Sequence, residues 1–200
     1  MLFLNISSDK VHISDVKKEI FLERYGIENI LGAKLIDRYK KNPFTEDFLL
    51  NGPGGFTTLR VGTLCINLLT KLLDYKKSPK IKIYDISKID LYKYLYKKNI
   101  LPRYGIIYIG QKRNIWKYDF KYDKYEVLVN QNLGSVSDLF FDFLSDSDYR
   151  EETKNMLSLK MTTKGLQILF KKKSFWIDIV DLELKPKFQV KPQYLIEAVK

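Results

Sequence analysis

The fold of this 200-residue chain is decided by the stretch Phe48-Leu49-Leu50-Asn51-Gly52-Pro53-Gly54-Gly55-Phe56. The three apolar residues at its start predict a short buried strand, and the glycines predict a tight turn into a helix over residues 57–73. Gly54 and Gly55 are expected to supply positive φ in that turn. A glycine turn between a strand and a helix leaves backbone N–H groups unpaired at a positive helix end, so the loop is a candidate anion site.

Known nucleotide-binding motifs do not match this loop. It lacks the Lys-Ser/Thr pair of a P-loop and the three-glycine spacing of a dinucleotide fingerprint. Two readings of the local chemistry therefore stay open, a phosphate site and a purely structural turn.

The helix after the loop is apolar over more of its surface than one sheet requires. Projected at 100° per residue, its apolar side chains cover an arc of roughly 220°, whereas a helix on one sheet needs a stripe only somewhat wider than about 100°. One rim of the arc holds Val61, Leu64 and Leu68. The other rim holds Leu59, Ile66 and Leu73. The extra apolar surface meets either a second helix of this chain or a partner, and the sequence does not decide which rim faces outward.

Outward from the loop, alternating apolar residues predict two or three strands up to about residue 24, and helical spacing predicts a helix over residues 27–39. The order strand 81–86, helix 89–97 and strand 104–109 predicts parallel pairing. Residues 116–122 and 125–129 are expected to form a hairpin, residues 139–144 and 166–170 helices, and residues 175–184 a strand. Both halves run from strands to helices, which indicates two lobes, residues 1–78 and 79–200.

Charge and composition limit the function classes. The net charge of +11 favours nucleic acid as a partner, and the lysines at 76–77, 97–98 and 171–173 support an RNA-binding module. The opposing reading is solvated surface, because only six of the 35 basic residues are arginines. Cys65 is the one cysteine and His12 the one histidine, so neither a disulfide nor a catalytic or metal-binding pair is expected. We expect a cytoplasmic protein without a signal peptide or membrane segment.

Residues 52–62 resemble the signature of the TsaB (YeaZ) family, which typically reads Gly-Pro-Gly-Ser-Phe-Thr-Gly-Leu-Arg-Ile-Gly at the start of a helix. Nine of these eleven positions match if Val61 counts for Ile, and the departures are Gly55 and Thr58. Weaker similarities to the family occur in the expected order along the chain, at residues 4–7, 111–116 and 192–195. The family's usual helix start between Asn5 and Phe48 has no match.

The resemblance implies an α/β chain with the actin-like ATPase (ASKHA, RNase H-like) duplicated two-lobe fold, in which mixed sheets are flanked by helices. It also implies a non-catalytic subunit that binds TsaD and supports threonylcarbamoylation of the adenosine next to the tRNA anticodon. The complex with TsaD uses ATP, so this chain alone is expected to bind no cofactor and no metal. The expected partners are TsaD, TsaE within the complex, tRNA through the complex, and a second copy when TsaD is absent.

The candidate site residues fall in two groups. The glycine-loop group comprises Asn51, Gly52, Pro53, Gly54, Gly55, Phe56, Thr57 and Arg60. The partner-interface group comprises Leu59, Val61, Leu64, Ile66 and Leu68, with Leu35 and Tyr39 from the preceding helix. The alternatives are a small actin-fold enzyme that uses the loop on phosphate, which Asn5 argues against because actin-like ATPases have an acidic residue there, and the RNA-binding module.

Overall fold

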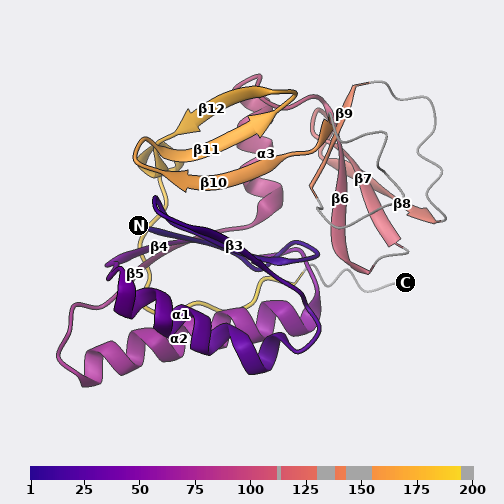
Figure 1. Cartoon of the computed structure of the whole chain (residues 1–200). Helices are drawn as coiled ribbons and strands as arrows, with labels where there is room; N and C mark the ends of the chain where they lie inside the picture. The colour runs from indigo at the N-terminus through magenta and orange to yellow at the C-terminus, as the bar shows by residue number, and fades with distance from the viewer. Residues whose placement is uncertain (112–113, 130–137, 143–154, 195–200) are drawn as a thin grey trace.

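A computed structural model describes residues 1–111, 114–129, 138–142 and 155–194. Together they form a mixed α/β structure built on three sheets (Figure 1).

The first sheet carries the glycine loop. Its five strands are β1 (Leu2–Asn5), β2 (Val11–Ser14), β3 (Glu19–Leu22), β4 (Glu46–Leu50) and β5 (Lys82–Ile86), in the order β3-β2-β1-β4-β5. β4 lies parallel to both β1 and β5, whereas β2 lies antiparallel to β1 and β3. The strands predicted before residue 24, at residues 48–50 and at residues 81–86 are therefore confirmed.

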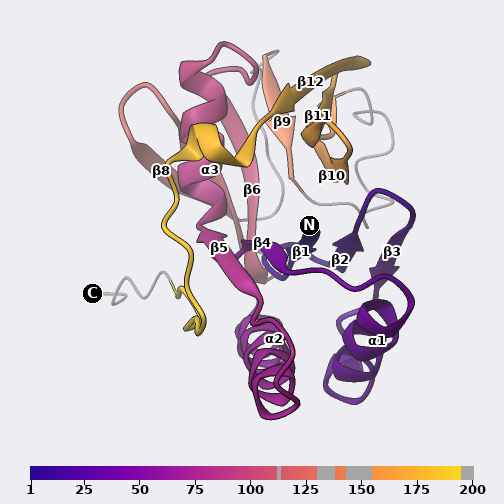
Figure 2. The ribbon, with the colours of Figure 1, turned by 90° about the vertical axis from the view of Figure 1, so that its left-hand side faces the viewer.

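Two helices cover one face of this sheet, α1 (Ile27–Lys41) and α2 (Phe56–Tyr75), and they lie side by side in Figures 1 and 2. α1 ends where the sequence predicts, because Pro43 follows the C-cap Asn42 and cannot continue a helix. Leucines and isoleucines from both helices pack on side chains of β1 and β2 in one core. The two helices predicted from apolar spacing are confirmed.

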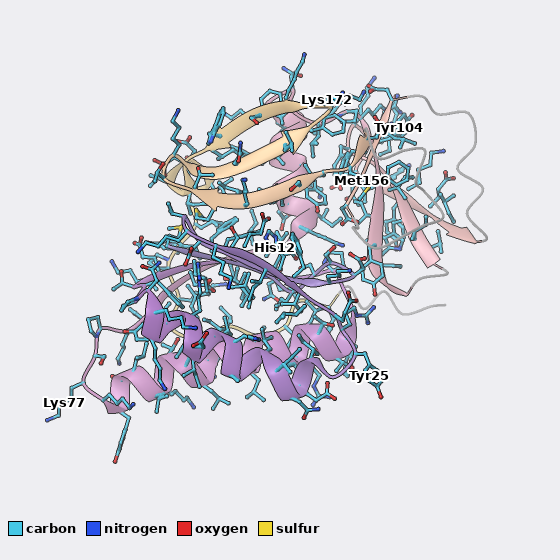
Figure 3. All side chains as sticks on the ribbon, viewed as in Figure 1. His12, Tyr25, Lys77, Tyr104, Met156 and Lys172 are labelled. Carbon is cyan, nitrogen blue, oxygen red and sulfur yellow. The ribbon has the colours of Figure 1, made fainter. Side chains whose placement is uncertain are left out.

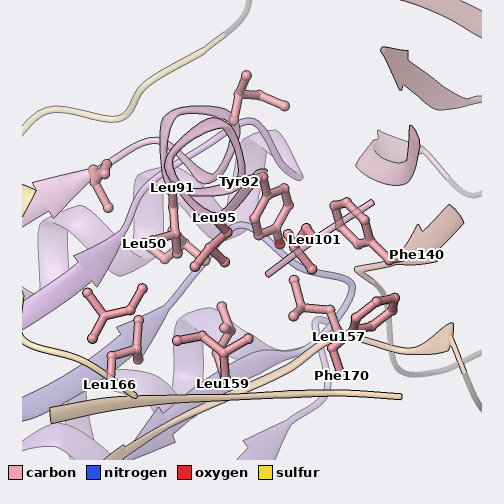
Figure 4. Close-up of a cluster of buried hydrophobic side chains, with 14 of the residues drawn as sticks. Leu50, Leu91, Tyr92, Leu95, Leu101, Phe140, Leu157, Leu159, Leu166 and Phe170 are labelled. Atoms are coloured by element: carbon pink, nitrogen blue, oxygen red, sulfur yellow. The ribbon is translucent and has the colours of Figure 1, made fainter. Parts of the chain in front are cut away.

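The opposite face of the first sheet is covered by α3 (Lys88–Lys97) and by a three-stranded antiparallel sheet of β10 (Ser158–Thr162), β11 (Gly165–Phe170) and β12 (Lys173–Ile177). Figure 4 shows Leu159 and Leu166 of this small sheet turned toward Leu50 of β4 and toward Leu91 and Leu95 of α3. This second core joins the two layers.

The remaining sheet contains β6 (Tyr104–Gln111), β7 (Asn114–Asp119), β8 (Lys124–Val129) and β9 (Leu139–Phe141), in the order β8-β7-β6-β9. β7 is antiparallel to its neighbours and β9 is parallel to β6. The order and directions repeat those of β3-β2-β1-β4 in the first sheet. The predicted hairpin over residues 116–129 is confirmed, with its turn at residues 120–123.

Several sequence predictions are wrong. Strands β5 and β6 lie in different sheets, so the β5-α3-β6 unit is not a parallel pair. Residues 139–141 and 165–170 are strands rather than helices, and only the first part of 175–184 is strand, because Ile179–Leu182 forms a 3₁₀ helix. Residues 143–144 of the first of these lie outside the described residues.

The first sheet also extends past the predicted lobe boundary. β5 follows residue 78 yet pairs with β4 along its whole length. The chain returns to this layer once more after the 3₁₀ helix, as Figure 2 shows, because Lys187 pairs with Ile83 of β5 and Val190 packs in the core beneath α2. The N-terminal layer is therefore built from residues 1–86 together with part of the C-terminal segment.

Candidate functional site

The glycine loop begins with two residues held by distant parts of the chain. Asn51 is fully buried, and its side-chain amide donates to the Lys191 carbonyl at 2.8 Å. Gly52 donates its N–H to the Ser7 hydroxyl at 2.6 Å and accepts from the Lys88 N–H at 2.7 Å. The loop therefore connects β1, α3 and the C-terminal segment.

The glycines act differently from the prediction. Gly52 has a φ of 78°, whereas Gly55 has a φ of −64° and Gly54 is not among the residues with positive φ. Gly54 lies too close to another part of the backbone for a side chain. A Cβ at this position would lie 2.7 Å from the backbone oxygen of Ser7. The expectation of positive φ at Gly54 and Gly55 is wrong, and the motif needs glycine at Gly54 for a close backbone approach instead.

A cation covers the N-terminus of α2. The guanidinium of Arg24 donates from Nε to the Thr58 hydroxyl at 3.3 Å and from a terminal nitrogen to the Gly110 carbonyl at 3.4 Å, and it lies where a Cβ on Gly55 would be. Burial lowers the pKa of Arg24 from its usual value. Gly110 itself approaches the backbone of Gly54 closely. The chain's own groups thus occupy the space over Gly54 and Gly55, whereas Gly52 and Pro53 line a cavity of about 400 Å³ that also borders Trp116 and Tyr125.

Beside the loop lies a buried ion pair that the sequence did not reveal. Lys88 Nζ lies 2.7 Å from an Asp142 carboxylate oxygen, and both side chains are almost completely buried. The ammonium also donates to the carbonyls of Ser7 and Tyr108, which lie in the first sheet's layer and in β6. Burial raises the pKa of the Asp142 carboxyl to about 6 and lowers that of Lys88. The pair connects the loop after β1 to the β6–β9 sheet.

α2 presents two distinct sides. Leu59 and Ile66 are fully buried in the chain's own core, and so is Leu35 of α1. These three residues, predicted at the partner interface, cannot reach a partner in this fold. Leu64 and Leu68 are 56% and 54% exposed. The rim that faces outward is therefore the one that carries Leu64 and Leu68.

The outward apolar strip continues along α2. Val61 and Cys65 are half-buried beside the exposed leucines, and Leu72 adds a further exposed side chain. Tyr39 is half-buried and packs edge-on against Phe44, so it contributes only part of its ring. We call Val61, Leu64, Leu68 and Leu72 the α2 strip.

The first turn of α2 is also exposed. The Phe56 ring stacks on Tyr194 at 5.0 Å between ring centroids, and the guanidinium of Arg60 lies 5.1 Å from the Phe56 centroid. Thr57 is exposed, and Pro53 is buried in the loop. A cavity of about 620 Å³ lies between this turn and residues 190–194. Of the predicted loop residues, Phe56, Thr57 and Arg60 are the ones that reach solvent as side chains.

The histidine and the cysteine behave as structural residues. His12 lies in β2, and its ring contacts the rings of Phe3 and Phe21; Figure 3 labels it. Burial lowers the pKa of His12 to about 4. The Cys65 thiol faces Gly32 of α1, and burial raises its pKa. No group of three potential metal-binding side chains occurs among the described residues.

By length and composition, α2 is the one helix in the described part of the chain that would be long and apolar enough to cross a membrane. The inner side of α2 packs on the first sheet, and 44% of the most apolar part of the helix is buried. The apolar length of α2 is thus partly accounted for by the chain's own core.

No protein-family model and no curated protein matches the chain. Solved structures that are similar to it include the following two. One is YeaZ from Pseudomonas aeruginosa, with 14% sequence identity and a TM-score of 0.42 over 78% of this chain and 79% of that chain. The other is described as an uncharacterized protein with similarity to peptidase YEAZ from Pseudomonas aeruginosa, with 14% identity and a TM-score of 0.48 over 97% and 98% of the two chains. Both descriptions name YeaZ, the family that residues 52–62 resemble.

Proposed function

We propose that this chain is a non-catalytic scaffold of the TsaB type that binds TsaD through the outer side of α2. The observation that carries the proposal is the α2 strip, in which Leu64, Leu68 and Leu72 are 56%, 54% and 39% exposed on a helix whose other side is buried in the core. Exposed contiguous apolar surface of this kind marks protein interaction sites. The Gly-Pro-Gly motif that resembles the family opens the same helix.

The position of α1 supports a helical interface. α1 lies beside α2 on the same outer face of the molecule, so two parallel ridges are available to a partner (Figures 1 and 2). Ile36 of α1 is partly exposed, and the half-buried Cys65 of α2 faces Gly32 of α1. A partner that presents a matching pair of helices would cover the α2 strip and the exposed side of α1 together.

The covered N-terminus of α2 supports a role without catalysis. Arg24 lies over the N-terminus of α2, and the Lys88 ammonium is bound by carbonyls and by Asp142. We therefore propose that the loop shapes the entry of α2 and that ATP is used by the complex with TsaD rather than by this chain. A phosphate-using enzyme would need an open loop, so that alternative is not favoured.

The remaining assignments follow from the same proposal. Strand order and directions are shared by the β3-β2-β1-β4 and β8-β7-β6-β9 sheets, which supports the duplicated two-lobe, actin-like plan. TsaE and tRNA would join through the complex, in the cytoplasm. A second copy of this chain would occupy the α2 strip when TsaD is absent.

The proposal is tested by co-purification with TsaD from the same organism. We expect the unaltered chain to retain TsaD and a Leu68→Asp variant to lose it, because an unpaired carboxylate at the centre of an interface costs several kcal/mol. Val180→Asp is the matched control, since Val180 is a 78% exposed aliphatic residue of the 3₁₀ helix, away from α2. Retention of TsaD by Leu68→Asp, or its absence with the unaltered chain, would refute the proposal.

A further inference from the structure

The small sheet β10-β11-β12 carries basic side chains and no acidic one. Residues 158–177 contain five lysines and no aspartate or glutamate. The lysines are not confined to one turn: Lys160 lies within β10, Lys164 in the β10–β11 turn, and Lys171, Lys172 and Lys173 at the β11–β12 turn. Positive charge is thus present at both ends of the sheet and in its middle.

The two faces of this sheet differ sharply. Leu159, Leu166 and Ile168 point into the core beneath it. On the other face, Lys160, Gln167 and Trp176 stand opposite one another across the three strands. Neighbouring strands are about 4.8 Å apart, so these residues form a row roughly 10 Å long. Leu169 lies on the same face and is 43% exposed.

Trp176 is the most informative residue of the outer face. It is 47% exposed, whereas Trp116, the other tryptophan of the chain, is 6% exposed. Lys164 Nζ lies 5.3 Å from the centroid of the Trp176 ring system. Trp176 lies on the edge strand β12, and an exposed indole beside lysines has the chemistry of a base-stacking platform with phosphate-binding cations.

We propose that the outer face of β10-β11-β12 binds single-stranded nucleic acid, with a base stacked on Trp176 and backbone phosphates paired with Lys160, Lys164 and Lys172. Lys171 already pairs with Asp138 at 2.7 Å, so it contributes less to an incoming phosphate. Lys172 lies at the hairpin tip, where Figure 3 labels it, and it forms no ion pair with the residues that the structure describes.

An anionic membrane is the competing ligand for a basic surface, and the outer face suits it poorly. Only Leu169 and Trp176 are exposed large apolar residues on the face. Amphipathic membrane contacts bury a continuous apolar surface to a depth of roughly 5–10 Å. The mixture of one indole, lysines and Gln167 therefore favours nucleic acid.

The location leaves this site independent of the proposed TsaD interface. In Figures 1 and 2 the small sheet and the α1–α2 layer lie at opposite ends of the molecule, with the first sheet between them. Both surfaces can be occupied at once. Loss of one activity would leave the other intact, so their failures are distinguishable.

The test is a titration of a fluorescently labelled oligouridylate of about twelve nucleotides, a length within the range bound by single-strand proteins, with the full chain at several salt concentrations. We expect Trp176→Ala to raise Kd roughly tenfold or more. The paired change Lys160→Gln with Lys164→Gln should reduce the slope of log K against log salt by about 0.7 for each lysine. Tryptophan emission should change on binding in the unaltered chain but not in Trp176→Ala, where only the buried Trp116 remains.

The matched control is Lys97→Gln with Lys98→Gln, which removes the same charge at the end of α3, outside this sheet. Melting curves establish that each variant is folded. Equal affinity of Trp176→Ala and the unaltered chain would overturn the proposal, as would an equal effect of the α3 control. Binding to phosphatidylserine vesicles without binding to the oligonucleotide would assign the face to membranes instead.

Discussion

Asp47 is a carboxylic acid buried among apolar residues. It lies in β4 opposite Leu2 and Ile83, both in the apolar core, and its carboxylate oxygens have no hydrogen-bond partner among the described residues. Burial raises its pKa well above the usual value, and the positive amino terminus offsets this only in part. The folded chain therefore holds a proton that the unfolded chain releases above pH 3.8.

From this we predict a stability that falls as pH rises. A carboxyl whose folded pKa is raised contributes its full stability below the unfolded pKa and loses it as pH approaches the folded pKa, at up to about 1.4 kcal/mol per pH unit. Asp47→Asn removes this titration. We expect its melting temperature to exceed that of the unaltered chain near pH 7 and the difference to shrink toward about pH 4. An identical pH profile for both proteins would show that Asp47 is ionised or paired.

Gly54 of the loop can be tested by an alanine substitution, with Gly32 of α1 as the control position. A Cβ on Gly54 would meet rigid backbone atoms of Ser7, whereas a Cβ on Gly32 would meet only the Cys65 sulfur at an ordinary 3.6 Å. We expect Gly54→Ala to destabilise by about 1–3 kcal/mol and Gly32→Ala to stabilise by up to about 1 kcal/mol, because alanine is the better helix former. Thermal melting measures both. Unchanged stability of Gly54→Ala would mean that the loop does not approach β1 as described.

Three residues beside the glycine loop could not be predicted from the sequence. Arg24, Lys88 and Asp142 determine what the glycine loop can bind, yet none belongs to a recognisable motif. Lys88 is the first residue of α3 and Asp142 follows β9, so they are 54 positions apart in the numbering and meet only through the fold. The choice between an anion site and a structural turn rests on local backbone geometry, which contains no information on the distant cation that lies over the start of α2.

At the scale of elements, long periodic segments were predictable and short apolar runs were not. α1 and α2 match the predicted helices to within two residues at each end, because several turns of apolar spacing specify a helix. The sequence predicts a helix over residues 166–170, where the structure has a strand. A run of five residues is too short to distinguish helical spacing from strand alternation. Leu166, Ile168 and Phe170 alternate with more exposed residues only once β10 and β12 pair on either side.

The α2 arc illustrates the same division. Its width could be predicted from the sequence, and so could the need for a second contact surface. The choice between the rims could not, since it depends on the angle at which α2 meets β1, where the Ile6 side chain leaves no room for a Cβ on Gly62. That contact fixes Leu59 and Ile66 inward and Leu64 and Leu68 outward.

At the scale of the whole molecule, the α2 strip and the outer face of β10-β11-β12 lie at opposite ends, and a cavity of about 950 Å³ lies between the first sheet and the small sheet. The α2 strip is apolar, and the outer face of β10-β11-β12 is basic with one exposed indole. Between them, the buried Lys88–Asp142 pair connects the loop after β1 to the β6–β9 sheet. The proposed scaffold would therefore have two separate surfaces for its partners.

The most direct test of the scaffold compares Leu64→Asp with Ile66→Asp, two changes of equal charge placed two residues apart on opposite rims of α2. Leu64 is exposed, so its variant should melt close to the unaltered chain and fail to retain TsaD in a pull-down. Ile66 is fully buried, so its variant should unfold, since a core position cannot hold an unpaired carboxylate. A folded Leu64→Asp protein that still retains TsaD would contradict the account, and so would unfolding of both variants.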